Sequence, residues 1–190
     1  MDLKVEPVVE NGPFWEDVGR LAREAFPPGE YFSPRKLMRM AQADDFDFWK
    51  ILDGSAFVGF MVVKTYDDLA YLFFLAIDPS HRSKGYGARV LVLVRTLYPQ
   101  KRLILDFEML DETAANSEQR KKRRAFYLRN GFQETGWFVS YNNIDFEIVS
   151  ADGHLDLEKY KALMLTLEIE HFHPRYFRKD ILSAGRQPIN

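Results

Sequence analysis

Residues 75–91 read LAIDPSHRSKGYGARVL, and this stretch decides the fold. It begins inside an almost wholly apolar run, residues 71–77, which is typical of a strand covered on both faces. The run stops at Asp78-Pro79, and an apolar pattern at helical spacing resumes over residues 88–98. The stretch therefore predicts a strand, a loop and a helix in succession.

A second apolar strand follows at once, over residues 103–107. Two strands joined through a helix form a crossover, and such crossovers are nearly always parallel and right-handed. We therefore predict a parallel strand–helix–strand unit over residues 71–107.

The loop in this unit has the composition of an anion site. Gly85 and Gly87 let the backbone come close to a bound group, and the helix that begins there directs free N–H groups to the same place. Arg82 and Lys84 add positive charge, so a pyrophosphate is a chemically sensible ligand. By itself the Gly-x-Gly pattern is weak, and an ordinary glycine-rich turn is the alternative.

Further strands and helices surround the crossover. Ser33 followed by Pro34 is typical of a helix start, and Asn130-Gly131 is typical of a helix end. The expected elements are a strand at 3–9, helices at 14–26 and 33–43, a hairpin of strands at 46–52 and 56–65 turning at Asp53-Gly54, a helix at 116–130, two strands within 137–148 turning at Asn142-Asn143, and a last helix at about 156–170.

Composition excludes several classes of protein. A chain of 190 residues fits one domain or a domain with an appendage, and its net charge of −2 gives no general attraction to nucleic acid or to an anionic membrane. The absence of cysteine excludes disulfides and zinc–thiolate sites and favours a cytoplasmic protein. Residues 1–10 lack the basic start and the apolar run that are typical of a signal peptide, and no later apolar run reaches about 20 residues, so we predict neither a signal peptide nor a membrane segment.

Two motifs resemble one family. Residues 75–91 resemble the acetyl-CoA signature of the GNAT acetyltransferases, in which Arg or Gln, two residues, Gly, one residue and Gly or Ala follow an apolar strand and an Asp-Pro turn. Residues 125–132, AFYLRNGF, look like the family's helix end with an aromatic residue, Tyr and Gly-Phe. The order of predicted elements over roughly residues 1–150 is also similar to that of the family.

The resemblance implies a fold and a division of the chain. The expected class is α/β (α+β), a GNAT-like mixed and mostly antiparallel sheet with a central parallel βαβ crossover and helices on both faces. Residues 1–150 would form the GNAT domain. Residues 151–190 would form a C-terminal helical extension that packs on the same domain, lines the acceptor cleft or contributes to a homodimer.

The same resemblance implies the reaction and the cosubstrate. In the family, an acyl thioester lies against a bulged central strand that is splayed from its neighbour, and the acceptor amine attacks the thioester directly. The cosubstrate would be acetyl-CoA, without a metal. The residues that match are those whose main chain would hold the pantetheine, Leu75, Ala76 and Ile77, and those whose N–H groups would hold the pyrophosphate, Arg82, Ser83, Lys84, Gly85, Tyr86, Gly87 and Ala88.

Tyr127 matches the family's tyrosine that donates a proton to the sulfur of coenzyme A. A phenol is protonated at neutral pH, and so it is able to act as an acid. The alternative is an aromatic side chain that only packs. Glu108 is the candidate general base, through water if necessary, with Asp106 two residues earlier. Either carboxylate is alternatively a plain strand-end residue, and an amine that arrives neutral needs no base.

Other polar residues have weaker assignments. Many family members have an asparagine about seven residues before the tyrosine, where this chain has Arg120, and Asn116 one turn earlier is the substitute cofactor residue. The basic run 120–124 is interpreted as a solvated helix face, with the 3′-phosphate of coenzyme A or RNA as alternatives. His171-Phe172-His173 lacks a third ligand in register, so we predict no metal site.

The acceptor is the least determined part. Aromatic residues near the family's acceptor side are Phe14, Trp15, Tyr31, Phe32 and Trp49, although core packing explains most of them. Small amines, amino-sugars, peptide N-termini and protein lysines all remain open. We prefer a small molecule because no extended polypeptide-binding segment is evident. The competing functions are a non-catalytic CoA-binding sensor or scaffold and, third, an RNA-binding domain.

Overall fold

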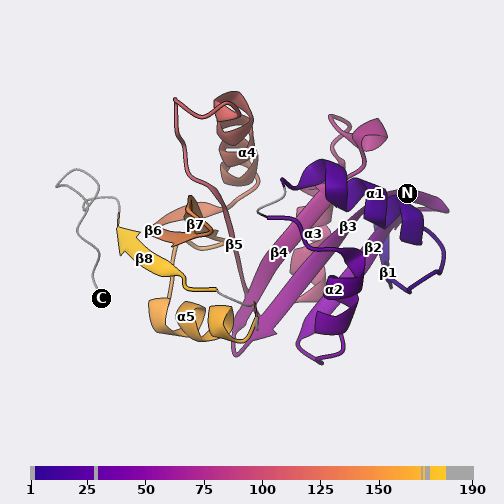
Figure 1. Ribbon diagram of the computed structural model, residues 1–190, viewed down its shortest axis with the longest axis horizontal. Coiled ribbons are helices and arrows are strands. Elements are labelled where there is room, and N and C mark those ends of the chain that lie inside the picture. The colour runs from indigo at the N-terminus through magenta and orange to yellow at the C-terminus, as the bar shows by residue number, and fades with distance from the viewer. Residues whose placement is uncertain (1–2, 28–29, 168, 170–171, 179–190) are drawn as a thin grey trace. The chain divides into compact units, whose positions relative to one another are not determined.

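A computed structural model describes residues 3–27, 30–167, 169 and 172–178 of the chain (Figure 1). The chain divides after Lys101 into two compact units. Each unit combines strands with helices.

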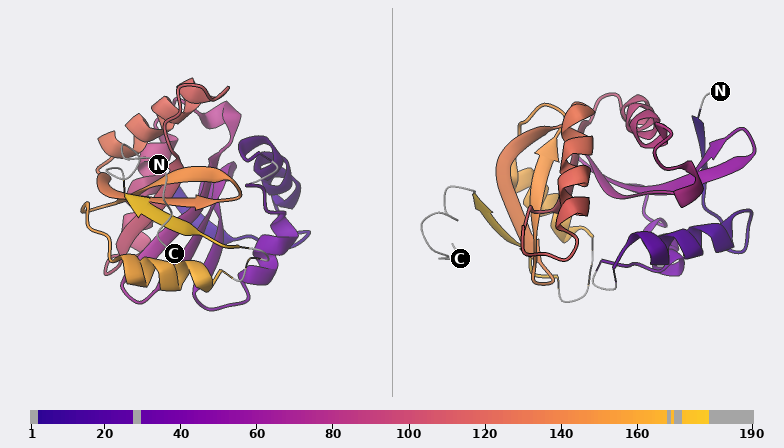
Figure 2. Two further views of the ribbon diagram at one scale, coloured as in Figure 1. Left: turned by 60° about the vertical axis from the view of Figure 1, so that its left-hand side comes forward. Right: turned by 90° about the horizontal axis from the view of Figure 1, so that it is seen from above.

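The first unit is built on antiparallel strands in the order β1-β2-β3-β4. Helices α1 and α2 lie on one side of these strands and α3 lies on the other (Figure 2, right). Apolar side chains from α1 and the strands, Val18, Leu21, Phe60 and Val62 among them, are fully buried between these layers. The elements are β1 (Leu3–Pro7), α1 (Trp15–Ala25), α2 (Pro34–Met40), β2 (Phe46–Asp53), β3 (Ala56–Tyr66), β4 (Leu69–Ile77), a single 3-10 turn η1 (Pro79–His81) and α3 (Tyr86–Leu97).

Strand β4 has a bulge at Phe73. Val63 of β3 pairs with Leu72 and Val62 pairs with Phe74, so one residue of β4 has no partner on β3. The rings of Phe73 and Phe74 consequently gather on the same side, with centroids 4.3 Å apart. A bulge shifts the alternation of side chains by one residue and bends its strand. The bulge that the family resemblance implies is therefore present in β4.

The second unit is also antiparallel, in the order β5-β7-β6-β8. Helices α4 and α5 flank these strands (Figures 1 and 2). Asn142 and Asn143 turn the chain between β6 and β7 with φ of 52° and 60°, as the predicted hairpin requires. The elements are β5 (Arg102–Glu108), α4 (Ser117–Arg129), β6 (Gln133–Tyr141), β7 (Ile144–Ser150), α5 (Leu157–Leu165) and β8 (Arg175–Arg178).

The predicted class, a mixed α/β fold with a mostly antiparallel sheet, is confirmed. The last helix differs from the prediction, because α5 ends at Leu165 and not near residue 170. Strand β8 was not predicted; it pairs with β6, and Phe177 stacks on Phe138 with ring centroids 5.5 Å apart. The division into a domain at 1–150 and an extension at 151–190 stays a prediction.

Candidate functional site

The loop between β4 and α3 ends in an uncapped helix N-terminus. Gly85 is the N-cap of α3, with φ of 80°, and it offers no side-chain hydrogen bond to the first turn. A Cβ atom at Gly85 would meet nothing within 4 Å, so the left-handed backbone, and not a lack of space, requires glycine here. The first-turn N–H groups of Tyr86, Gly87 and Ala88 have no helical carbonyl to bond to. Such N–H groups at the positive end of a helix dipole favour an anion.

The two cations of the loop fold back on its own backbone. Arg82 Nε donates to the carbonyl of Ile77 at 2.9 Å, and Lys84 Nζ donates to the carbonyl of Ser80 at 2.7 Å. A guanidinium nitrogen of Arg82 also lies 3.9 Å from Glu24 of α1. These bonds hold the loop and keep two positive charges beside it, and the anion site itself stays a prediction.

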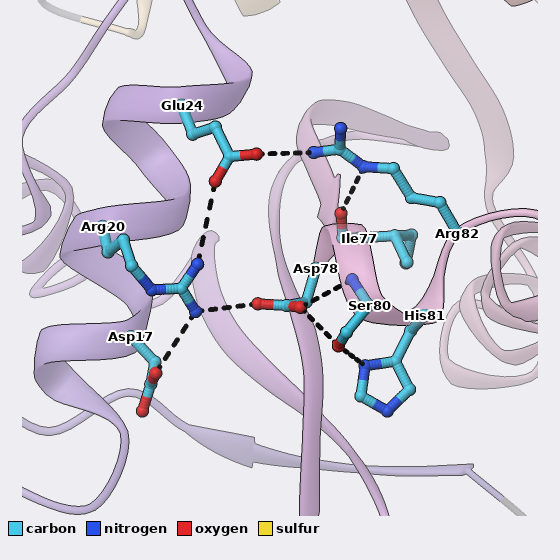
Figure 3. A network of polar contacts seen from close by, with 8 residues as sticks. All are labelled: Asp17, Arg20, Glu24, Ile77, Asp78, Ser80, His81 and Arg82. Carbon is cyan, nitrogen blue, oxygen red and sulfur yellow. Dashed lines mark hydrogen bonds and ion pairs between the residues drawn. The ribbon is translucent and has the colours of Figure 1, made fainter.

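Asp78 ties this loop to α1 (Figure 3). Its carboxylate accepts hydrogen bonds from the Ser80 N–H at 3.0 Å, the Ser80 hydroxyl at 2.6 Å and Arg20 at 2.8 Å. Burial alone would raise the pKa of Asp78, but the bonds from Ser80 and Arg20 outweigh it and lower the pKa to about 2. The Ser80 hydroxyl also meets His81 Nδ1 at 2.9 Å. The start of the loop is therefore fixed by an ionised, buried carboxylate.

Replacing Asp78 by asparagine should lower the free energy of unfolding at pH 7 by about 1–3 kcal/mol, because charge-assisted hydrogen bonds are lost. The folded-state pKa of Asp78 is lowered, so this stabilisation is complete above the unfolded value of about 4 and is lost as the pH falls toward 2. Urea unfolding should show the gap between wild type and variant shrinking from pH 4 to pH 2.

Asp17 provides the control, because it accepts from the same Arg20 at 3.3 Å but is 45% exposed. Asp17→Asn should cost less than about 1 kcal/mol, as exposed ion pairs do. An Asp78→Asn effect that stays constant down to pH 2 would contradict the role given to the carboxylate.

The main chain of β4 that precedes the loop is closely packed. Gly59 of β3 pairs with Ile77, and a Cβ atom at Gly59 would lie 2.1 Å from the carbonyl oxygen of Ala76. Ala76 is buried, whereas Leu75 and Ile77 are half-buried. Residues 75–77, the predicted pantetheine strand, thus join the bulge of β4 to the loop within the first unit.

Tyr127 of α4 lies in an aromatic cluster of the second unit. Its ring stacks on Phe107 with centroids 5.4 Å apart and meets the edge of Phe132 at 5.7 Å. Burial raises its pKa to about 12, the charge of Arg123 opposes that rise and the charge of Asp106 adds to it. The phenol is consequently protonated throughout the neutral range, as the predicted acid must be.

Glu108, the predicted base, is bound by cations of α4. Its buried carboxylate lies 3.1 Å from Arg120 and 2.7 Å from Arg123, and the Asn116 amide donates to both of its oxygens at 3.0 and 3.2 Å. Both of its oxygens are thus taken up by hydrogen bonds from α4 and its N-cap. The geometry favours the alternative, in which Glu108 fastens α4 to the end of β5.

Asn116 is engaged on both sides. Its amide nitrogen bonds to Glu108, and its oxygen accepts from Arg120 Nε at 2.9 Å. Arg120 also donates to the carbonyl of Met109 at 2.8 Å. Arg120 therefore fills the position of the family's asparagine with a structural bond network, and the cofactor role of Asn116 stays a prediction.

The remaining basic run is mostly paired with acids. Arg124 bonds to the buried Glu147 of β7 at 2.9 Å and also to Glu134, and Lys121 bonds to Glu118 at 3.1 Å. This pairing neutralises much of the positive charge on α4, which weakens the alternative of an RNA-binding face.

Asp106 has two phenol partners. Its oxygens accept from Tyr141 at 3.1 Å and from Tyr160 of α5 at 2.6 Å. The carboxylate that was considered beside Glu108 therefore holds α5 to the strands of the second unit.

The aromatic residues proposed for the acceptor side separate into different places. Phe14 stacks on Phe57 with centroids 5.5 Å apart, and the Trp49 indole donates to Tyr98 at 3.3 Å. Phe32 instead meets Phe73 at the bulge of β4, at 5.5 Å. Phe32 thus lies against the bulge of β4.

Within the part of the chain that the structure describes, no group of three or more His, Asp or Glu residues is arranged to hold a metal. Of the histidine pair singled out in the sequence, His171 lies outside the described residues. No helix in the described ranges is long and apolar enough to cross a membrane.

Sequence reasoning missed Arg20, Asp53 and Gly59. Asp78-Pro79 and Asp53-Gly54 were interpreted as a strand stop and a turn, and nothing in their local pattern indicates the partners that fold on them. The contacts that these three residues make are determined by how α1, β3 and α3 pack in the first unit.

One family model and several solved structures are similar to this chain. Residues 44–134 match the family model of an acetyltransferase (GNAT) domain. No curated protein is similar enough in sequence to count as a match. Among solved structures, a putative GNAT-family acetyltransferase from Bacteroides thetaiotaomicron is 23% identical, with a TM-score of 0.68 over 86% of this chain and 95% of that one.

Two further structures differ in what they act on. The ribosomal-protein-S18-alanine N-acetyltransferase from Escherichia coli is 18% identical, with a TM-score of 0.58 over 80% of this chain and 95% of its own. An aminoglycoside 6′-N-acetyltransferase in complex with coenzyme A is also 18% identical, with a TM-score of 0.60 over 77% and 95%. The expected fold is confirmed, residues 44–134 match the expected family model, and the fold itself occurs in proteins named for protein and for small-molecule acceptors.

Proposed function

We propose, on the premise that residues 44–134 are a GNAT acetyltransferase domain, that this protein transfers an acetyl group from acetyl-CoA to a primary amine. The observation that carries the proposal is the start of α3, where Gly85 leaves the first-turn N–H groups uncapped beside Arg82 and Lys84. This arrangement has the donors and the charge that a pyrophosphate requires. A serine or aspartate cap in place of Gly85 would have occupied those donors.

The other residues receive roles in the transfer. Main-chain groups of Leu75, Ala76 and Ile77 hold the pantetheine, and N–H groups from Arg82 to Ala88 hold the pyrophosphate. The amine nitrogen attacks the thioester carbonyl, a C–N bond forms, the C–S bond breaks, and Tyr127 gives its proton to the departing thiolate. The raised pKa of Tyr127 supports this assignment, because the phenol keeps its proton until the thiolate needs it.

We assign no general base. Two guanidinium groups and an amide already bond the oxygens of Glu108. The amine attacks in its neutral form, and after the C–N bond forms its positively charged nitrogen releases a proton to water, from which Tyr127 recovers the proton that it gave to the thiolate. The amide of Asn116 is bonded on both sides, and its cofactor role stays a prediction.

The proposed acceptor is a small-molecule amine, because no segment of the sequence has the character of an extended polypeptide-binding surface. The aminoglycoside acceptor of one structural neighbour agrees with a small molecule, while the protein acceptor of another marks the alternative. We propose a cytoplasmic location on the ground that the chain contains no cysteine.

Calorimetric titration with acetyl-CoA, followed by measurement of released coenzyme A with added amines, tests the function. We expect saturable binding, and release of coenzyme A with one class among small amines, amino-sugars and peptides. Binding without release for any acceptor, proteins included, would favour the non-catalytic sensor. Failure to bind acetyl-CoA would overturn the proposal.

A further inference from the structure

Helix α3 is fastened to β2 at both of its ends. At its first residue, the Tyr86 hydroxyl donates to Asp53 Oδ2 at 2.8 Å. Just past its last residue, the Tyr98 hydroxyl donates to Asp47 Oδ2 at 2.5 Å. Both aspartates belong to β2, so one strand fixes the helix through two phenol–carboxylate bonds.

The two bonds differ in what lies around them. Tyr86 stands between the two glycines of the loop, and its ring meets the edge of His81 at 5.2 Å and lies 5.0 Å from the guanidinium of Arg89. The Tyr86 side chain therefore contacts the loop before α3 and the first turn of α3 at once. Tyr98, by contrast, is the C-cap of α3 and lies about three helical turns from the loop.

Asp53 depends on this bond. Its Oδ2 also lies 3.6 Å from Arg89, and its Oδ1 is buried without a hydrogen-bond partner in the described part of the chain. The hydrogen bond to Asp53, and burial after it, raise the pKa of Tyr86 above its ordinary value, so the phenol stays a donor. Loss of the Tyr86 hydroxyl would leave the half-buried carboxylate of Asp53 with one donor fewer, which costs free energy of folding.

We propose that Tyr86 is a positioning residue, whose bond to Asp53 sets the first turn of α3 so that its N–H groups meet the pyrophosphate of acetyl-CoA. The proposal rests on the function proposed above. It assigns to the side chain of Tyr86 a task that is separate from that of its backbone N–H. Two glycines make the loop flexible, and the bond from Tyr86 to Asp53 restricts it to one conformation.

The test is a double-mutant cycle with a matched cycle at the other end of the helix. Tyr86→Phe keeps the ring between His81 and Arg89 and removes only the hydroxyl. We expect it to weaken acetyl-CoA binding about tenfold and to raise KM for acetyl-CoA with little change in kcat. Asp53→Ala should weaken binding as well, and the double variant should lose little more than the worse single variant.

Tyr98→Phe and Asp47→Ala form the control cycle. They remove an equivalent bond from α3, so they should lower Tm at least as much as the first pair while the affinity for acetyl-CoA stays within about twofold. If wild type and Tyr86→Phe bind acetyl-CoA with equal affinity, the inference is overturned but the proposed function is not. Equal weakening by Tyr98→Phe would also overturn it, since general loosening of α3 would then explain the result. Wild type that binds no acetyl-CoA would overturn the proposed function as well.

Discussion

Replacing Gly85 by alanine should weaken acetyl-CoA binding about tenfold while leaving the fold intact. The N-cap of α3 has φ of 80°, where an alanine costs about 1–2 kcal/mol relative to glycine. No atom lies within 4 Å of the added methyl group, so a clash plays no part. In the free variant the exposed loop relaxes to negative φ, and binding must then restore the left-handed conformation at the cost of affinity.

Gly54→Ala is the matched control for this experiment. Gly54 has φ of 62° in the β2–β3 turn, and a Cβ atom there also meets nothing within 4 Å. The control should lower Tm by a similar amount and leave the affinity measured by calorimetry unchanged. If both variants bind acetyl-CoA as wild type does, the uncapped start of α3 is not the phosphate site.

Local signals in the sequence predicted helix starts and turns, which depend on a few neighbouring residues. Ser33 accepts a hydrogen bond from the Lys36 N–H at 3.2 Å, as its place before Pro34 indicated. Asn142 and Asn143 take the positive φ that a tight hairpin needs. The helix after Gly85 was predicted from residue 88, and α3 begins two residues earlier, at Tyr86, because Gly85 is its N-cap.

Features set by packing could not be predicted. The bulge at Phe73 depends on how β3 and β4 align, and both residues beside it are as apolar as their neighbours. Strand β8 has only four residues, and its pairing with β6 comes from contacts such as Phe177 with Phe138. A sequence pattern records apolar periodicity, whereas register is a property of two strands together.

Side-chain chemistry was predicted by type but not by partner. Glu108 was recognised as a carboxylate near a strand end, yet the sequence could not show that Arg120 and Arg123 turn inward to it from α4. The basic run of α4 was interpreted as a solvated face for the same reason. Charged residues three or four positions apart lie on the same side of a helix. Whether that side faces acidic residues or solvent depends on how the helix packs.

Replacing Tyr127 by phenylalanine should lower kcat by about 10²–10⁴-fold, as loss of a general acid does. The affinity for acetyl-CoA should change little, because the stacking of the ring on Phe107 does not need the hydroxyl. The raised pKa of about 12 adds a second expectation: the acid stays protonated as the pH rises, so kcat in wild type should show no fall from this group below about pH 11.

Tyr176→Phe is the control for the same chemistry. Its hydroxyl is buried without a hydrogen-bond partner among the described residues, and burial also raises its pKa, but no role in transfer is proposed for it. The control should leave kcat within about twofold, since a hydroxyl without a bond contributes little when it is removed. Unchanged turnover in Tyr127→Phe would reduce Tyr127 to a packing residue and require another acid. Loss of turnover in both variants would mean that the aromatic packing of the second unit, and not proton transfer, limits the rate.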